Sequence, residues 1–165
     1  MDWKKILKVL SAIGFCQIAG IVGAFFTTPA ITTWYASLAK PSFAPPNWLF
    51  GPVWITLYTL MGISLYLVWE AKDSREKKTA IGVFGAQLFL NALWSFLFFG
   101  LELPAAGFIG IIFLWVFIFI NIILFYKVSK NAAYLLVPYV VWVTIAAYLN
   151  YMIMVLNAIG IPELM

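Results

Sequence analysis

The sequence predicts an all-α membrane protein, a bundle of five transmembrane helices with a long proline- and aromatic-rich first loop. Hydrophobic residues make up 65% of the 165 residues and charged residues only 10%, whereas a soluble domain is about 45–50% apolar and about 25% charged. The apolar residues also gather in five runs, each close to the roughly 20 residues that a helix needs to cross the hydrocarbon core. Charged or proline-rich stretches separate these runs.

The first apolar run covers about residues 6–27, and Lys4, Lys5 and Lys8 lie before it or in its first turn. A charged start before an apolar stretch is also the pattern of a cleaved signal peptide. This run is long enough to span the membrane, however, and no small-x-small cleavage site ends it. We therefore expect it to remain as the first transmembrane helix.

The stretch from Trp34 to Trp48 is the only long non-helical segment that we expect between two spans. It contains Pro41, Pro45 and Pro46, and proline fixes φ and lacks an N–H, so this part cannot be the interior of a helix. Backbone without its own hydrogen bonds must stay out of lipid or lie buried in protein. We predict a stiff, aromatic lid over one end of the bundle; the alternative is a plain surface loop.

Four more apolar runs follow the lid, at about residues 47–69, 80–99, 105–126 and 132–157. A densely charged loop separates the second and third spans, and short turns separate the others. Pro138 lies within the fifth run. Because proline removes one intrahelical hydrogen bond, we expect a bend there or a carbonyl that a neighbour must satisfy.

The basic residues indicate how the chain is oriented. Nine of the ten Lys and Arg residues fall at the N-terminus, in the second loop or in the fourth loop, and Lys40 stands alone on the other side. The positive-inside rule therefore predicts a cytoplasmic N-terminus, with the first loop and the C-terminus outside. Because the basic residues form short groups between apolar runs, they indicate orientation and give no sign of nucleic-acid binding.

Several kinds of chemistry lack the residues that they need. The chain has no histidine and a single cysteine, Cys16, which leaves out the commonest general base and the usual metal ligands. No Asp, Glu, Lys, Arg or His falls in the interior of a span as drawn, although such groups mark ion-coupled pumps and antiporters. Because histidine is absent and cysteine occurs once, we expect no metal site. Because no residues form a nucleophile–base pair, we expect no hydrolytic catalysis.

Aromatic residues make up 19% of the chain, and four of the eight tryptophans lie deep within spans: Trp54, Trp94, Trp115 and Trp142. A buried indole needs a partner for its N–H, and lipid provides none, so these side chains should face the bundle. The same helix faces carry Tyr58, Asn91, Phe98, Tyr139, Ala146 and Asn150. Two interpretations remain open, namely hydrogen bonds that join the helices and a cavity for a flat apolar ligand.

Small residues recur four apart in three spans, a spacing that lets helix backbones approach closely within one chain or between two. The pairs are Ala19 with Gly23, Gly82 with Ala86, and Ala106 with Gly110.

Several motifs occur in order along essentially the whole chain: Trp34-Tyr35 with Lys40-Pro41-Ser42-Phe43-Ala44-Pro45-Pro46, Gly51-Pro52-Val53-Trp54 with Tyr58, Asn91-Ala92-Leu93-Trp94-Ser95, and Pro138-Tyr139-Val140-Val141-Trp142 with Ala146, Leu149 and Asn150. In these motifs the chain resembles the TspO/MBR family, the tryptophan-rich sensory proteins related to the mitochondrial translocator protein. The resemblance implies a five-helix bundle that forms a homodimer, here in a bacterial cell membrane.

The resemblance also implies a pocket beneath the first loop that binds protoporphyrin IX and benzodiazepine- or isoquinoline-type compounds. By position, Tyr35 matches a lid tyrosine, and Trp54 and Trp142 match tryptophans tied to porphyrin breakdown. The full expected ligand site is Tyr35, Trp54, Tyr58, Asn91, Trp94, Phe98, Tyr139, Trp142, Ala146 and Leu149. The family's cholesterol motif requires a basic residue shortly after Tyr151, and none follows, so cholesterol is not an expected partner through that motif.

Three functions are compatible with these expectations. The first is light- and oxygen-dependent degradation of protoporphyrin IX, with Trp54 and Trp142 as oxidisable neighbours and no further cofactor. Without histidine a haem would lack its usual axial ligand, which favours the metal-free porphyrin. The second is a stress sensor or transport accessory that binds porphyrin or lipid without turnover. The third is a packing partner of another membrane complex.

Overall fold

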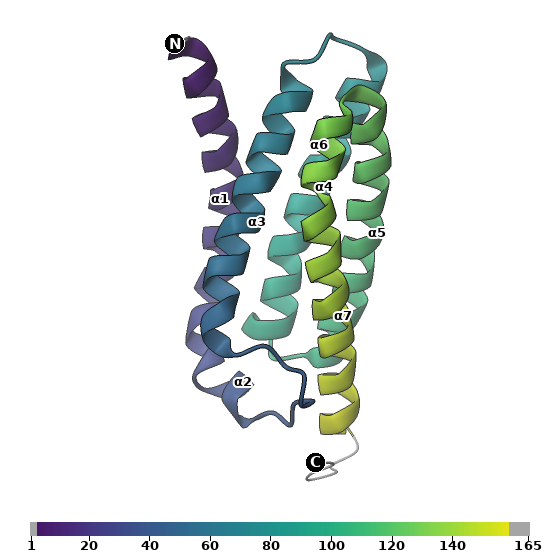
Figure 1. Cartoon of the computed structure of the whole chain (residues 1–165). Helices are drawn as coiled ribbons and strands as arrows, with labels where there is room; N and C mark the ends of the chain where they lie inside the picture. Colours follow the sequence, from purple (N-terminus) through teal and green to yellow (C-terminus); the bar gives the residue numbers. More distant parts are fainter. Residues whose placement is uncertain (1–2, 159–165) are drawn as a thin grey trace.

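The computed structural model describes residues 3–158, which are almost entirely helical (Figure 1). The elements are α1 (Trp3–Ile31), α2 (Trp34–Ser37), α3 (Asn47–Trp69), α4 (Arg75–Ser95), η1 (Phe96–Gly100), α5 (Pro104–Val128), α6 (Lys130–Leu135) and α7 (Val137–Ala158). Within this part of the chain, five helical units are long and apolar enough to cross a membrane: α1, α3, α4 with η1, α5, and α6 with α7. The predicted five-span, all-α bundle is confirmed.

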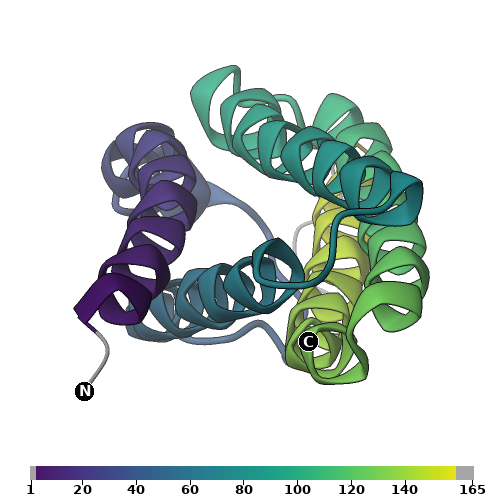
Figure 2. The ribbon, with the colours of Figure 1, turned by 90° about the horizontal axis from the view of Figure 1, so that it is seen from above.

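The long helices form a ring, which Figure 2 shows from above. Helix α1 packs on α3, α3 packs on α6, α7 packs on α5, α5 packs on α4, and α4 returns to α1. Helix α2 and the end of α7 lie at one end of the ring, the loop end, and the start of α1 lies at the opposite, N-terminal end (Figure 1).

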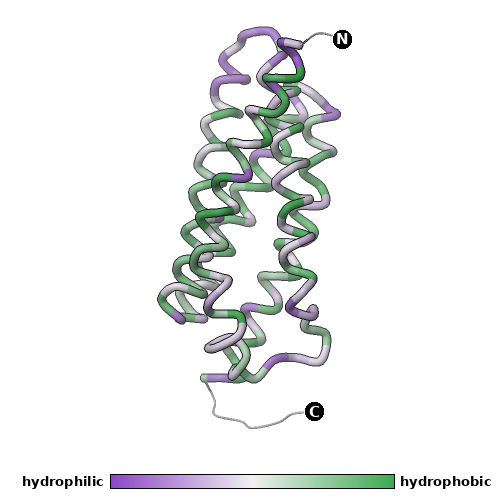
Figure 3. Tube along the Cα trace, turned by 90° about the vertical axis from the view of Figure 1, so that its left-hand side faces the viewer, coloured by the Kyte–Doolittle hydropathy of each residue, from purple (hydrophilic) through white to green (hydrophobic). Residues whose placement is uncertain are grey.

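Most residues along the length of the bundle are hydrophobic, and hydrophilic residues gather at the N-terminal end, with others at the loop end (Figure 3). Large side chains such as Phe25, Ile21 and Phe89 expose 78%, 68% and 67% of their surface. An apolar surface of this extent, on five helical units long enough to cross a membrane, indicates contact with lipid. The protein is therefore a multi-pass integral membrane protein.

Helix α4 begins at Arg75, five residues before the predicted start of the third span. Ser74 caps it, because the Ser74 hydroxyl oxygen accepts a hydrogen bond from the Lys77 backbone N–H at 3.1 Å. The sequence prediction was based on apolar residues alone and missed this polar first turn.

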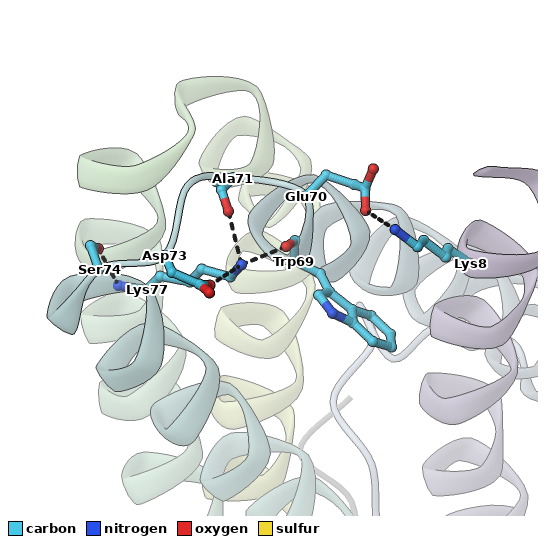
Figure 4. Close-up of polar contacts among 7 residues, drawn as sticks. All are labelled: Lys8, Trp69, Glu70, Ala71, Asp73, Ser74 and Lys77. Carbon is cyan, nitrogen blue, oxygen red and sulfur yellow. Dashed lines mark hydrogen bonds and ion pairs between the residues drawn. The ribbon is translucent and has the colours of Figure 1, made fainter. Parts of the chain in front are cut away.

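Lysine side chains hold the N-terminal end together (Figure 4). Lys77 Nζ donates to the carbonyls of Trp69 (2.6 Å) and Ala71 (2.8 Å) and to the Asp73 carboxylate (2.9 Å). Lys77 thereby satisfies carbonyls at the end of α3 and in the loop that follows it, which have no intrahelical partner. An ion pair of 2.7 Å between Lys8 and Glu70 ties α1 to the end of α3.

Two irregularities shape the inner surface. The fifth span is interrupted at Leu136, between α6 and α7, as the nearby Pro138 led us to expect. The end of the third span is a π-helical turn, η1, in which the Leu101 N–H donates to the Phe96 carbonyl at 2.8 Å. This wider turn places the neighbouring rings of Phe98 and Phe99 both inside the bundle, where they are 2% and 5% exposed.

The first loop differs from the prediction at one point, because residues 34–37 form a turn of helix, α2. Residues 38–46 are not helical, as their prolines predicted. Lys40 explains the local fold, since its Nζ donates to the carbonyls of Tyr35 (2.6 Å), Ala36 (3.3 Å) and Leu38 (2.9 Å). The lysine thus satisfies the free carbonyls of this very short helix.

Candidate functional site

The first loop crosses the loop end of the bundle and is fastened to α7. Asn157 forms two hydrogen bonds with the backbone of Ala39: its Nδ2 donates to the Ala39 carbonyl, and its Oδ1 accepts from the Ala39 N–H, both at 3.0 Å. The ring of Phe43 stacks on that of Tyr148, with centroids 5.1 Å apart and planes 12° apart. These contacts make the loop a closed lid.

Tyr35 is the inner face of this lid. Its side chain is 2% exposed, and its ring meets those of Phe50, Phe98 and Phe99 at centroid distances of 5.7–6.4 Å. Burial raises the pKa of Tyr35 to about 12, and its hydroxyl has no hydrogen-bond partner among the described residues. Tyr35 therefore acts here as a neutral, packed ring.

Lys40 strengthens the lid from its outer side. Its ammonium group lies 4.8 Å from the centroid of the Tyr35 ring, a cation–π contact that adds to its three carbonyl bonds. Partial burial lowers the pKa of Lys40. Because these contacts already occupy its donors, Lys40 stabilises the closed lid and is not positioned to receive a ligand carboxylate.

Asn91 joins three helices at the centre of the bundle. Its Oδ1 accepts from the Tyr58 hydroxyl of α3 at 2.5 Å, and its Nδ2 donates to the Tyr139 hydroxyl of α7 at 2.7 Å. All three side chains are buried. This chain of hydrogen bonds satisfies polar groups that would otherwise be unpaired in an apolar interior.

Asn150 makes a second polar link closer to the loop end. Its Oδ1 accepts from the Trp94 indole N–H at 3.1 Å, and its Nδ2 donates to the Pro104 carbonyl at 2.8 Å. Asn91 and Asn150 both face inward, as predicted, and both join helices. The hydrogen-bonding interpretation of these amides is therefore correct, and it coexists with a cavity.

A cavity of about 500 Å³ lies between α1, α3 and α4. Helices α3 and α4, with η1, give it an aromatic wall that contains Phe50, Trp54, Tyr58, Trp94 and Phe99. The Trp54 ring centroid lies 5.6 Å from that of Tyr58 and 6.3 Å from that of Trp94. These rings form a continuous apolar surface against which a flat molecule can stack.

The opposite wall comes from α1, and the sequence prediction missed it entirely. It consists of small, polar and apolar residues on one face: Gln17, Gly20, Ile21, Gly23, Ala24, Thr27, Thr28, Ile31 and the following Thr32. Polar and small residues that recur three or four apart in an otherwise apolar helix are a signal of an inward face. That signal was present in the sequence, and the small residues were considered only for helix packing.

A second, much smaller space of about 20 Å³ lies beneath the lid. It is bordered by Tyr35, Phe98, Ala146 and Leu149, while Trp94 borders both spaces. The expected ligand residues are therefore divided. Trp54, Tyr58, Asn91 and Trp94 face the large cavity, and the positions expected directly beneath the lid surround a space that their own side chains nearly fill.

Tyr139 and Trp142 border neither space. Tyr139 is fully packed, with its ring 6.3 Å from that of Trp54. Trp142 lies edge-on to Phe50 at 6.2 Å, and its buried indole N–H finds no acceptor within residues 3–158. Of the two tryptophans expected to act on a ligand, Trp54 thus faces the cavity and Trp142 does not.

The functional groups that the lining side chains present to the cavity are aromatic rings, hydroxyls and amides. In the part of the chain that the structure describes, no three His, Cys, Asp or Glu side chains lie close enough together to hold a metal ion. The lining residues can stack on a ligand, exclude water from it and hydrogen-bond to its edge.

The sequence profile of the TspO/MBR family matches residues 12–156. The chain belongs to this family. It is 48% identical to the tryptophan-rich protein TspO of Archaeoglobus fulgidus, over 93% of this chain and 99% of the relative. It is 42% identical to the tryptophan-rich protein TspO of Chlorobaculum tepidum, over 93% and 98%. It is also 36% identical to the human translocator protein, over 85% and 86%. The expected resemblance is confirmed.

Proposed function

We propose that this TspO/MBR protein binds a flat, largely apolar tetrapyrrole such as protoporphyrin IX in the cavity between α1, α3 and α4. The observation that carries the proposal is the aromatic wall of Trp54, Tyr58 and Trp94 along a cavity of about 500 Å³. This volume lies within the roughly 300–1,000 Å³ typical of small-molecule sites. Benzodiazepine- and isoquinoline-type compounds, which also carry fused aromatic rings, should compete for the same surface.

The loop end of the cavity supplies hydrogen-bonding groups for the polar edge of such a ligand. Thr28, Thr32 and Asn47 border the cavity there, and all three are exposed. Hydroxyl and amide groups can donate to the propionates of protoporphyrin, while the apolar ring lies deeper against the indoles. The site requires no further cofactor.

A titration with protoporphyrin IX tests this proposal. The porphyrin's own absorbance should change saturably with wild-type protein in detergent micelles. Stacking of a flat ring on an aromatic side chain contributes about 1–3 kcal/mol in nucleic-acid complexes, so Trp54→Ala should weaken binding about tenfold or more. Trp69→Ala, at the end of α3 and away from the cavity, is the control. Wild-type protein without saturable binding would refute the proposal.

We further propose that light and oxygen degrade the bound porphyrin. The excited porphyrin acts as its own photosensitiser toward oxygen, and the indole of Trp54 is an electron-rich neighbour in the cavity wall. In air and under light, wild-type protein should bleach protoporphyrin faster than the double variant Trp54→Phe with Trp142→Phe. Under argon the wild-type protein should not bleach it. Because Trp142 borders neither space, Trp54→Phe alone should account for most of the difference.

Binding without turnover is the second candidate, for a stress sensor or a transport accessory. The position of Trp142 behind Phe50 and outside the cavity wall favours it, since only one of the two expected indoles lies in that wall. Equal bleaching rates in wild type and double variant, together with saturable binding in the dark, would support this function over degradation.

We propose that the protein forms a homodimer through the outer face of α4. Gly23 packs on Ser95 and Gly110 on Leu97, so those two small-residue pairs serve contacts within the chain. Gly82 and Gly85, in contrast, are exposed, and a Cβ added to either would meet no described heavy atom within 4 Å. Gly82→Leu should raise the monomer fraction in cross-linking experiments, and Gly14→Leu should not.

We also propose that the N-terminal end faces the cytoplasm of a prokaryotic cell, because the basic residues gather there. Cys16 is buried, so a single introduced thiol can report the orientation. Ser42→Cys on the exposed surface of the lid should react with an impermeant reagent added outside intact cells. Reaction only after the cytoplasmic side has been opened would reverse the orientation.

A further inference from the structure

We propose that the ligand reaches the cavity sideways from the bilayer, through a mouth between α1 and α3, while the lid remains closed. This inference rests on the proposed porphyrin binding and adds the route by which the ligand arrives. It follows from which of the seams around the cavity are sealed and which one is open.

The seam between α1 and α4 is sealed. Gly23 lies so close to α4 that an added Cβ would come within 3.0 Å of the Ser95 hydroxyl. Nearer the loop end, the ring of Phe26 lies 5.2 Å from that of Phe96 and also packs against Gly100. The contact of Gly23 with the Ser95 side chain and the aromatic packing leave no passage for a macrocycle on this side.

The seam between α1 and α3 is sealed only in its N-terminal half. A Cβ added to Gly62 would collide with the Cα of Ile13, so the two backbones touch there. One turn further, Gln17 Nε2 donates to the Ile55 carbonyl at 3.0 Å and to the Thr59 hydroxyl at 3.1 Å. These bonds close the seam up to the level of Gln17.

Gly20 still packs against the Tyr58 ring of α3, and beyond Gly20 the same seam is open. Ile21 on α1 and Ile55 on α3 both border the cavity, yet they expose 68% and 61% of their surface. Gly51, one turn from Ile55, also borders the cavity, is exposed, and has room beside it for a side chain. Residues that line a cavity and are also exposed form its rim, and these lie within the membrane spans. The mouth therefore faces hydrocarbon.

The route beneath the lid is blocked in the same structure. The pair of hydrogen bonds between Asn157 and Ala39 and the stacked rings of Phe43 and Tyr148 fasten the lid to α7. Under it, the ring of Tyr35 and its aromatic neighbours leave only about 20 Å³. A ligand arriving from water would have to break the fastening and displace these rings, whereas the lateral mouth needs neither.

The chemistry of the ligand agrees with this route. A tetrapyrrole with an apolar ring and a carboxylate edge partitions into the bilayer with its edge at the interface. The mouth has the same polarity, with apolar Ile21 and Ile55 at depth and polar Thr28 and Asn47 toward the loop end. The ligand can therefore slide in without reversing its orientation or leaving the membrane.

The test measures how fast protoporphyrin IX binds when it is delivered already dissolved in lipid vesicles that contain the protein. Gly51→Phe places a ring in the mouth and should slow association about tenfold or more. Gly14→Phe, on an equally open outward face of α1 away from the cavity, should leave the rate unchanged. Asn157→Ala, which releases the lid, should also leave it unchanged.

The outcomes separate this route from the proposed function. A plugged mouth slows association and dissociation together, whereas a damaged site accelerates dissociation, so both rates are recorded. If Gly51→Phe does not fold, Ile55→Trp places its ring at the same rim. If the rim variant binds and releases protoporphyrin IX at the wild-type rates while Asn157→Ala associates with it faster, the lateral route is overturned and passage beneath the lid is favoured. Wild-type protein that binds no porphyrin at equilibrium would instead refute the proposed function itself.

Discussion

The hydrogen-bond chain through Asn91 allows a direct measurement of what holds the cavity's aromatic wall in place. Asn91→Ala removes the acceptor of the Tyr58 hydroxyl and the donor to the Tyr139 hydroxyl, both inside the bundle. Side-chain hydrogen bonds within membrane proteins contribute about 0.6 kcal/mol on average and about 1.7 kcal/mol at most. Two such bonds give an expected loss of about 1–3 kcal/mol in the free energy of unfolding.

Reversible unfolding in mixed micelles, titrated with SDS, measures this loss. Asn131→Ala is the matched control, because Asn131 is an exposed amide in α6 and its loss should change the stability by less than about 0.5 kcal/mol. Double-mutant cycles of Asn91→Ala with Tyr58→Phe and with Tyr139→Phe isolate each bond. Once Asn91 is gone, either Phe substitution removes a hydroxyl that lacks its partner and should cost less than it does in the wild type.

Coupling near zero in both cycles would contradict this reasoning, as would an Asn91→Ala variant as stable as Asn131→Ala. Either result would mean that the packing of the rings alone positions Tyr58 and Tyr139. The cavity wall would then depend on shape, and the central amide would be dispensable.

Two further predictions concern the N-terminal half of the bundle. Gly62→Ala should lower thermal stability in detergent by about 1–3 kcal/mol, because its Cβ would collide with the backbone of Ile13, while Gly14→Ala, in open space, should gain up to about 1 kcal/mol of helix propensity. The hydrogen bond from Lys77 lowers the pKa of Asp73 below its ordinary 3.8, so this contact stabilises the fold above that pH and is lost as the pH falls through the lowered pKa. An unfolding series from about pH 5 to about pH 2 should show this loss in wild type and a smaller loss in Lys77→Met.

Hydropathy located the spans well because side chains that face lipid must be apolar. The second span was predicted as residues 47–69, and α3 has these bounds because Pro46, at its N-cap, stops the helix from extending backward. Helix α4 instead starts at Arg75, where a serine cap and charged residues extend a helix beyond its apolar part. Such an extension depends on local hydrogen bonds that a count of apolar residues does not register.

The candidate site was predictable to a lesser degree. The inward direction of Asn91 and Asn150 followed from the cost of an unpaired amide in hydrocarbon, and it is correct. The position of the cavity did not follow, because its volume depends on how far α1 stands from α3, and no single residue specifies that separation. Glycine contacts at positions 20 and 62 set this separation, and they become visible only when the two helices are seen together.

Because η1 is a widened turn, the number of residues in this segment affects ligand binding, whichever residues they are. A π-helical turn contains one residue more than the α-helical turn it replaces. Loss of a single codon within residues 96–100 would let this segment relax to an ordinary α-helix, and the residues on one side would rotate by about 100° relative to the other. Phe99 would then leave the cavity wall although every residue contributed by α1 and α3 stayed the same. A homologue one residue shorter at this point would recognise a differently shaped molecule.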